Sequence, residues 1–257
     1  MFPYKLYDYI FEAPLAYDDE SDKLIGKTDS ETKTKWGKLP PTNLTIEELT
    51  VWVNERDRDG TLKGEIVGRG ATRQAEFNDG KTVFKWNYSH AIGNQTKVEA
   101  QTYTKYGKEF SDILPKMYRH GENWIVQEKA EPFTSEKFKQ VAHLERIMRP
   151  TANAGIVLRA YFELMSGVIE VVPFDMLKEY RKKSFDTFVS MMEDKGFYDI
   201  GYTTIYHVLT NNDNVFRIVE FCAKTNVALE DMRPANLGFI GDRLVVIDSG
   251  FKFGVNK

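Results

Sequence analysis

The stretch that most constrains the fold of this chain runs from residue 229 to residue 250. Within it, residues 237–240 and 243–247 are apolar runs of β-favouring side chains, and Gly241-Asp242 lies between them. A two-residue loop that begins with glycine is typical of a type II′ turn between antiparallel strands. Because loop length sets the register, residue 240 is predicted to pair with 243, and 237 with 246. The sequence therefore predicts a short β-hairpin.

Polar side chains gather at the open end of this hairpin. The register puts Asn236 opposite Ile247, and Asp248 is the next residue along the chain. Asp231 precedes Asn236 by five residues. Carboxylate and amide oxygens are hard ligands of the kind that Mg²⁺ takes alongside phosphate oxygens. A magnesium and phosphate site is therefore predicted here.

These residues resemble two motifs of protein kinases. Asp231-Met232-Arg233-Pro234-Ala235-Asn236 is similar to the catalytic loop Asp-x-(Lys/Arg)-x-x-Asn, and Asp248-Ser249-Gly250 is similar to the Asp-Phe-Gly metal motif, with serine in place of phenylalanine. The resemblance implies that Asp231 accepts or orients the proton of the substrate hydroxyl and that Arg233 offsets charge on the transferred phosphoryl group. It also implies that Asn236 and Asp248 hold Mg²⁺.

The region upstream is β-rich, with strands predicted over residues 64–70, 72–77 and 82–86. Glycines at 68 and 70 allow backbone N–H groups to approach a phosphate closely. Followed by a strand that carries Lys85, they resemble the kinase Gly-rich loop and its phosphate-binding lysine. The third glycine of that pattern is missing, and the interval to the lysine is short.

A helix is predicted over residues 94–106, ending with Gly107 at the C′ position. In the kinase pattern a glutamate on this helix pairs with the strand lysine. The resemblance assigns that role to Glu99, with Glu109 as the alternative.

Two further strands are predicted over residues 113–118 and 124–128. The segment that follows resembles the kinase hinge, which binds adenine. The resemblance then puts Gln127 in the gatekeeper place, as one of the residues that bind the nucleotide, and assigns backbone contacts with the nucleotide to Glu128 and Ala130.

The rest of the chain is predicted to be helical. Helical spacing of apolar residues covers 135–150, 156–170 and 175–195, and Asn214 is predicted to cap a helix that leads to Asp231. Cys222 lies on the apolar stripe of that helix, which indicates a core residue. Basic residues between 178 and 183 are interpreted as a solvated face, with docking of an acidic partner as the alternative.

The order of these elements predicts an α+β protein with the two-lobed, protein-kinase-like fold. Residues 1–59 are predicted to be an N-terminal arm and mobile segment, 60–131 a small antiparallel β lobe with one helix, and 132–257 a helical lobe truncated after the Asp-Ser-Gly motif. Since only seven residues follow Gly250, the chain resembles the minimal Ser/Thr kinases encoded by some bacteriophages.

Composition limits the other functions. A net charge of −3 gives no sign of a nucleic-acid partner, and one cysteine excludes a disulfide framework. No membrane span or signal peptide is predicted, so the expected location is the cytoplasm, or the host cytoplasm if the chain is phage-encoded.

The leading hypothesis is an ATP- and Mg²⁺-dependent Ser/Thr protein kinase that acts on host proteins. Its own hydroxyl groups in residues 16–43 are candidate sites of autophosphorylation. Two alternatives stay open. One is a small-molecule kinase of the aminoglycoside or choline type, and the other is a pseudokinase that binds and blocks a host protein.

Overall fold

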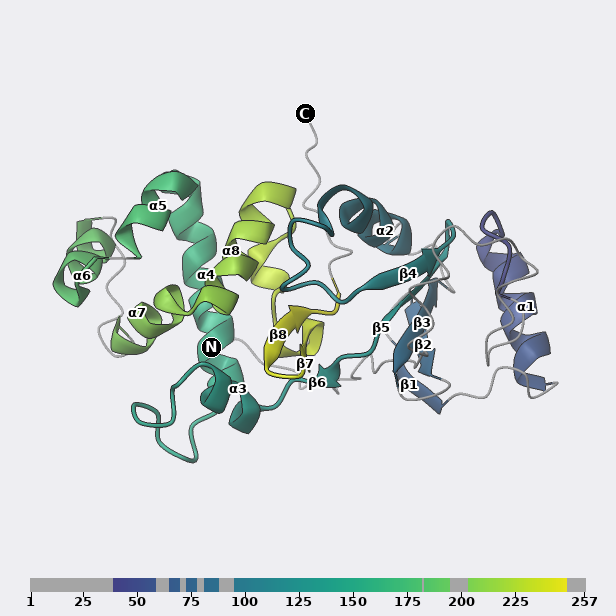
Figure 1. Ribbon diagram of the computed structural model, residues 1–257, viewed down its shortest axis with the longest axis horizontal. Coiled ribbons are helices and arrows are strands. Elements are labelled where there is room, and N and C mark those ends of the chain that lie inside the picture. The colour runs from purple at the N-terminus through teal and green to yellow at the C-terminus, as the bar shows by residue number, and fades with distance from the viewer. Residues whose placement is uncertain are drawn as a thin grey trace, which may run out of the picture. The chain divides into compact units, whose positions relative to one another are not determined.

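The computed structural model describes residues 39–58, 65–69, 73–77, 81–87, 95–181, 183–194 and 203–248 (Figure 1). The chain divides into two compact units. Unit 1 consists of residues 1–100 and 116–129, and unit 2 consists of residues 101–115 and 130–257. The predicted mobile segment before residue 39, the Asp79-Gly80 turn and the residues after Asp248 lie outside the described ranges.

Unit 1 is built on a five-stranded antiparallel sheet in the order β1-β2-β3-β5-β4. The strands are β1 (Glu65–Arg69), β2 (Arg73–Phe77), β3 (Thr82–Asn87), β4 (Met117–His120) and β5 (Trp124–Glu128). The predicted strands over 64–86 and 124–128 are thus confirmed. The predicted strand over 113–118 is wrong at its start, because Ile113 and Leu114 are buried in the hydrophobic core of unit 2.

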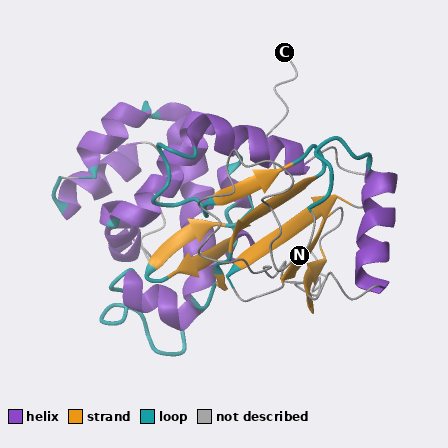
Figure 2. Ribbon diagram, turned by 45° about the vertical axis from the view of Figure 1, so that its right-hand side comes forward, coloured by secondary structure: helices purple, strands orange, loops and turns teal. Residues whose placement is uncertain are grey.

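The central strand β3 is buried at every position, because both of its faces are covered. One face carries Phe84 and Trp86, which pack in one core with Leu49 and Val53 of helix α1 (Ile46–Arg58). In Figure 2 this helix stands at the right edge, alongside the sheet. The helix therefore shares the core of unit 1, although the sequence prediction assigned residues 1–59 to an arm.

A capping box starts α1. The Thr45 N–H donates to Glu48 Oε2 at 2.8 Å, and the Glu48 N–H donates to Thr45 Oγ1 at 3.2 Å. Each side chain thereby satisfies a backbone donor that the first helical turn leaves without a partner. The spacing Thr45-x-x-Glu48 is a sequence signature of such a box and predicts a helix through Val53. The structure confirms the box, and the helix runs on to Arg58.

Helix α2 (Gln95–Tyr106) carries the chain from unit 1 into unit 2. Its predicted extent is confirmed and Gly107 directly follows its last residue, but Gly107 has no positive φ and so lacks the left-handed conformation typical of a C′ glycine. Instead, the Gly107 N–H donates to the carbonyl oxygen of Tyr103, and the chain continues in turns.

Unit 2 is mainly helical. Its helices are α3 (Ser135–Val141), α4 (Ala154–Val171), α5 (Phe174–Tyr180), α6 (Phe185–Asp194), α7 (Thr203–Asn211) and α8 (Asp213–Thr225). The predicted helix over 135–150 stops at Val141, since His143 adopts a left-handed φ of 56°. The predicted helix over 175–195 is two helices, and α7 was not predicted.

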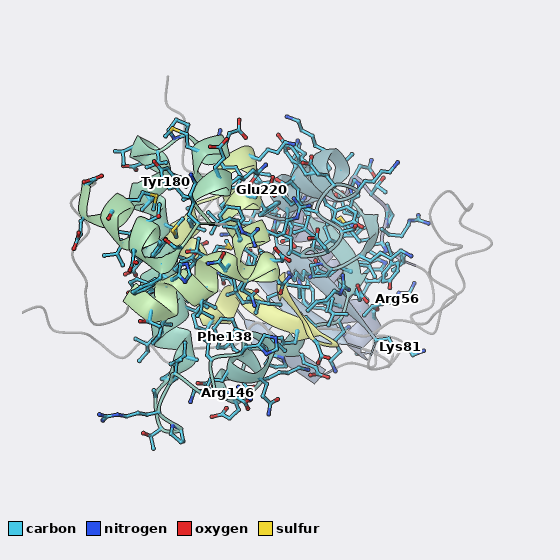
Figure 3. The ribbon with its side chains drawn as sticks, turned by 60° about the vertical axis from the view of Figure 1, so that its left-hand side comes forward. Arg56, Lys81, Phe138, Arg146, Tyr180 and Glu220 are labelled. Atoms are coloured by element: carbon cyan, nitrogen blue, oxygen red, sulfur yellow. The ribbon has the colours of Figure 1, made fainter. Side chains whose placement is uncertain are left out.

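Two basic residues of the second helical region, Lys178 and Arg181, are engaged within unit 2. Lys178 pairs with Glu220 at 2.7 Å, and Arg181 pairs with Asp213 and lies over the Phe216 ring. Figure 3 labels Glu220, on α8. These residues fasten α5 to α8 rather than forming a uniformly solvated face.

The hairpin predicted at the C-terminal end is confirmed in every pair. Strands β7 (Leu237–Ile240) and β8 (Arg243–Val246) pair antiparallel, from Ile240 with Arg243 to Leu237 with Val246. Gly241 has a φ of +59° and Asp242 keeps a negative φ, as a type II′ turn requires. The two-residue strand β6 (Glu131–Pro132) joins the other edge of β7.

The close approach of β6 to β7 explains why residue 238 is a glycine. A Cβ at Gly238 would lie 2.7 Å from the carbonyl oxygen of Glu131 and 2.9 Å from Cβ of Ala130. A side chain at this position would therefore push β6 away from β7.

Helix α8, which precedes the predicted catalytic loop, is capped by a different residue from the predicted one. Asn212, not Asn214, caps α8, because its Oδ1 accepts the N–H of Val215 at 3.0 Å. Asn214 Oδ1 instead accepts the N–H of Leu244 at 2.7 Å and so covers part of the outer edge of β8. An edge donor of β8 in a buried residue is thereby satisfied.

The α+β class is confirmed. The described elements follow the predicted order, with an antiparallel sheet and α2, then a run of helices, then a loop and a hairpin, and α1 precedes them. Among the helices that the structure describes, none is long and apolar enough to cross a membrane.

Candidate active site

A buried ion pair joins the strand lysine to the helix glutamate of unit 1. Lys85 Nζ lies 3.3 Å from Glu99 Oε1, and the two side chains are 6% and 7% exposed. Of the two glutamates that the sequence left open, the structure places Glu99 against Lys85. Glu109 lies in unit 2 and pairs with Lys224.

The local geometry explains why Glu99 reaches the lysine. Lys85 alternates with Phe84 and Trp86 along β3, so it points to the face of the sheet opposite α1. Asn87, two residues on, shares that face, and its Oδ1 accepts a hydrogen bond from Thr96 Oγ1 at 2.7 Å. One helical turn after Thr96, α2 presents Glu99 to the lysine.

Gln127 belongs to the same cluster. It lies in β5 opposite Val83, which puts its side chain on the face that carries Lys85. With the amide oriented so that its oxygen faces the ammonium, the oxygen accepts from Lys85 Nζ at 3.1 Å and the nitrogen donates to Glu99 Oε1 at 3.0 Å. In the opposite orientation the amide oxygen would face the Glu99 carboxylate and the amide nitrogen would face the Lys85 ammonium. The hydrogen-bond network therefore favours the orientation with the oxygen toward Lys85.

The glycine-rich segment is described only in part. Gly68 lies in β1 opposite Ala75, and the register with β2 shifts between Ile66 and Gly68, as in a β-bulge. Gly70 lies outside the described residues. Binding of phosphate by these glycines stays a prediction.

The two residues predicted to form a hinge, Glu128 and Ala130, lie in different units. Glu128, in unit 1, donates its N–H to the carbonyl oxygen of Lys116 at 2.7 Å, and its Oε2 accepts the Lys116 N–H at 3.2 Å. Ala130, in unit 2, packs with Val245 and Ile247. The N–H of Glu128 is thus engaged within unit 1, and nucleotide contacts of Glu128 and Ala130 stay a prediction.

The predicted catalytic loop consists of two single-turn 3₁₀ helices, η3 (Leu229–Asp231) and η4 (Pro234–Asn236). The carbonyl oxygen of Asp231 joins them. It accepts the N–H of Arg233 at 2.8 Å and the Nδ2 group of Asn236 at 2.7 Å. The asparagine thereby closes the loop that carries the candidate catalytic aspartate.

The same hydrogen bond directs the oxygen of Asn236. Because Nδ2 is tied to Asp231, Oδ1 is left without a hydrogen bond to any residue that the structure describes. The backbone N–H groups of Ile247 and Asp248 approach the Asn236 carbonyl oxygen at 2.9 and 3.4 Å. Asn236 and Asp248 are therefore neighbours at the open end of the hairpin, as predicted.

This donor set suits Mg²⁺ that arrives with a nucleotide. In the described part of the chain, no three His, Cys, Asp or Glu side chains cluster so as to hold a metal ion. One amide oxygen and one carboxylate are too few for a protein-only site, but they match an ion whose other ligands are phosphate oxygens and water.

Within the predicted catalytic loop, charged residues lie on both sides of Asp231. Arg233 lies 3.5 Å from Asp231 Oδ1, and its side chain is 49% exposed. Glu230 accepts a hydrogen bond from Ser166 of α4 at 2.6 Å. Sequence reasoning missed Ser166, since a serine 64 positions away carries no local signal.

Cys222 is a core residue, as predicted. Burial raises the pKa of its thiol, and the nearby carboxylates of Asp231 and Glu230 raise this pKa further. A buried thiol that stays protonated is a poor nucleophile.

No protein-family model matches the chain, and no curated protein matches it either. Among solved structures, the ADP-bound aminoglycoside phosphotransferase APH(2″)-Ib is 13% identical, with a TM-score of 0.33 over 78% of this chain and 70% of that chain. A streptomycin–ATP–APH(2″)-IIa ternary complex and a gentamicin–APH(2″)-IIa complex are each 14% identical and cover 82% of this chain, with TM-scores of 0.33 and 0.35; they are covered over 72% and 71% of their own lengths. Similarity at this level says nothing of substrate or activity.

Proposed function

We propose that this chain is an ATP-dependent phosphotransferase that transfers a phosphoryl group to a hydroxyl. One observation carries the proposal. The amide of Asn236 is fixed by the carbonyl of Asp231, five residues earlier on the same loop, and the backbone N–H of Asp248 lies 3.4 Å from the Asn236 carbonyl oxygen, so two aspartates and an asparagine come from adjoining backbone. Separate polar turns would have no reason to share this arrangement.

Each residue has a role in this proposal. Asp231 accepts or orients the proton of the attacking hydroxyl, and Arg233 offsets negative charge on the transferred group. Lys85, held by Glu99, binds the nucleotide phosphates. Asn236 and Asp248 would hold Mg²⁺, which when bound neutralises phosphate charge. The protein contributes mostly by positioning these groups and by stabilising charge.

We infer that the acceptor is a serine or threonine hydroxyl of a protein. Arg233-Pro234 supports this choice, because a basic residue two positions after the aspartate followed by proline resembles the loop of protein kinases more than that of small-molecule kinases. The proteins of a host cell, and hydroxyl groups of residues 16–43, are the substrates that we expect.

The first experiment compares the wild-type chain with Asp231→Asn, each expressed in bacteria, by mass spectrometry of phosphopeptides. The substitution should lower transfer by about 10²- to 10⁴-fold, since it removes the general base, and leave the fold unchanged. Phosphoserine and phosphothreonine that appear with the wild type alone would support a protein kinase. A folded Asp231→Asn variant as active as the wild type would rule out the proposed role of this residue.

The second experiment separates the alternatives if no protein is phosphorylated. Calorimetry with MgATP, with ATP lacking Mg²⁺, and with the Asp248→Ala variant tests for a metal-dependent nucleotide site. Binding together with ATP consumption in the presence of small alcohols or aminoglycosides would indicate a small-molecule kinase. Binding without consumption would indicate a pseudokinase, and no binding would overturn the phosphotransferase proposal.

A further inference from the structure

The buried ion pair of unit 1 has fewer hydrogen bonds than its charges require if Lys85 and Glu99 are considered alone. Their contact of 3.3 Å is longer than the 2.7–2.9 Å typical of a charge-assisted hydrogen bond. The ammonium group has three donors, and a carboxylate accepts several hydrogen bonds. Burial of two such groups needs further polar partners, because each loses its water.

Gln127 supplies one partner to each charge. Its oxygen accepts from Lys85 Nζ and its nitrogen donates to Glu99 Oε1, and the residue is 3% exposed. Both polar atoms of the amide therefore face the ion pair. A side chain used in this way has little left to offer to a nucleotide base, which is the role that the gatekeeper place implied.

The backbone holds Gln127 rigidly in this position. Strand β5 lies inside the sheet, between β3 and β4, so it is bonded on both edges. The pairs Val83 with Gln127 and Lys85 with Ile125 put the glutamine one strand away from the lysine and two residues along. Such diagonal neighbours on one face of a sheet are within reach of long side chains.

We propose that Gln127 is a positioning residue, which fixes where Lys85 holds its ammonium group and so governs binding of nucleotide phosphates rather than recognition of the base. This inference rests on the proposed function, in which Lys85 binds those phosphates. It assigns Gln127 to the ion pair, in place of the direct contact with the nucleotide that the resemblance implied.

The test compares affinities for MgATP, MgGTP and adenosine in the full chain by calorimetry. Gln127→Met keeps the length of the side chain and removes both hydrogen bonds. We expect it to weaken MgATP binding by about tenfold, the effect of one lost charged hydrogen bond. MgGTP should weaken to the same extent wherever its binding is measurable, and adenosine affinity should stay unchanged, since adenosine has no phosphates.

A second variant keeps the shape of the side chain. Gln127→Glu still accepts from Lys85, but it can no longer donate to Glu99 and sets a like charge beside it. MgATP affinity should fall at least as far as in Gln127→Met. Thr82→Val is the matched control, because Thr82 Oγ1 is buried in the same sheet and has no hydrogen-bond partner among the described residues. This control should bind all three ligands like the wild type.

The outcomes are distinct. Equal losses of adenosine and MgATP affinity, or a changed preference between MgATP and MgGTP, would show a base contact and overturn the positioning role. Unchanged MgATP affinity in both Gln127 variants would overturn it as well. A wild-type chain that binds no MgATP would instead overturn the proposed function, whatever the Gln127 variants do.

Discussion

The two groups of candidate site residues are held in opposite ways. In unit 1, Lys85, Glu99 and Gln127 are buried and bonded to one another through their side chains. In unit 2, Asp231 and Asn236 are held by bonds to backbone, namely Asn236 Nδ2 to the Asp231 carbonyl and Ile247 N–H to the Asn236 carbonyl. A cluster made of side chains couples function to stability, because each charge depends on its partners. A loop held by its backbone leaves the aspartate free to be changed at little cost in folding.

This comparison is sharpest for Glu99. Replacing Glu99 by leucine leaves Lys85 in a buried place without its carboxylate, and we expect the free energy of unfolding to fall by about 3–5 kcal/mol. Urea unfolding followed by tryptophan fluorescence measures this loss, because Trp52, Trp86 and Trp124 all lie in unit 1.

The control is the double variant Lys85→Met with Glu99→Leu. Replacing a whole buried pair by apolar side chains is often nearly neutral, so the double variant should recover most of the lost stability. A double variant less stable than Glu99→Leu would mean that the pair does not behave as one unit.

In unit 2 we expect the largest losses of stability at positions where a new side chain would disturb the backbone. Gly238→Ala places a Cβ 2.7 Å from the Glu131 carbonyl oxygen and should lower the free energy of unfolding by about 1–3 kcal/mol through overpacking. Far-ultraviolet circular dichroism during urea unfolding follows the helical unit.

Gly241→Asn is the matched change in the same hairpin. Nothing lies within 4 Å of a Cβ there, so any loss comes from the positive φ of the turn, which asparagine adopts with less strain than most other side chains. Its free energy of unfolding should fall by only about 1 kcal/mol, the cost of the strained backbone without a steric clash. Equal losses at Gly238 and Gly241 would contradict the packing account.

Asn236 has a structural role through its Nδ2 group and a proposed Mg²⁺-binding role through Oδ1. Two substitutions separate these roles. Asn236→Ala and Asn236→Asp both remove the 2.7 Å bond to Asp231, so each should cost about 1–2 kcal/mol of stability. Only the alanine also removes the oxygen proposed for Mg²⁺. Calorimetry should therefore find Mg²⁺-dependent ATP binding in Asn236→Asp and not in Asn236→Ala; the same affinity in both would exclude Asn236 as a ligand.

The smallest effect is expected at a half-exposed ion pair outside both groups. Burial alone would raise the pKa of Glu220, but hydrogen bonds from Lys178 and Arg217 outweigh it and lower the pKa below its ordinary value of 4.5. A lowered folded-state pKa contributes stability above the ordinary value, and this contribution is lost as pH falls through the lowered pKa.

Glu220→Gln should therefore be less stable than the wild type by about 1 kcal/mol at pH 7, and the difference should shrink in acid. Urea unfolding of both proteins at neutral pH and at pH 3 measures it. A difference that grows in acid would show that the charge of Glu220 is not what stabilises the folded state.

The parts of the fold predicted correctly have local causes. Gly241-Asp242 sets the hairpin register through its turn, and Thr45 and Glu48 start α1 through their own backbone bonds. The wrong predictions concern residues whose state depends on distant partners. Asn214 is of a residue type that often caps helices, but its Oδ1 accepts the N–H of Leu244, thirty positions away.

Taken alone, the sequence determined the spacing that matters for chemistry, namely the lysine in a strand and the aspartate, asparagine and second aspartate around a hairpin. These depend on turn and strand geometry over a few residues. Only the tertiary structure decided that Glu99 rather than Glu109 faces Lys85, and that the Gln127 amide completes their pair. The physical reason is that a buried charge selects its partners from whatever the fold brings within about 3 Å, and separation along the chain does not encode that distance.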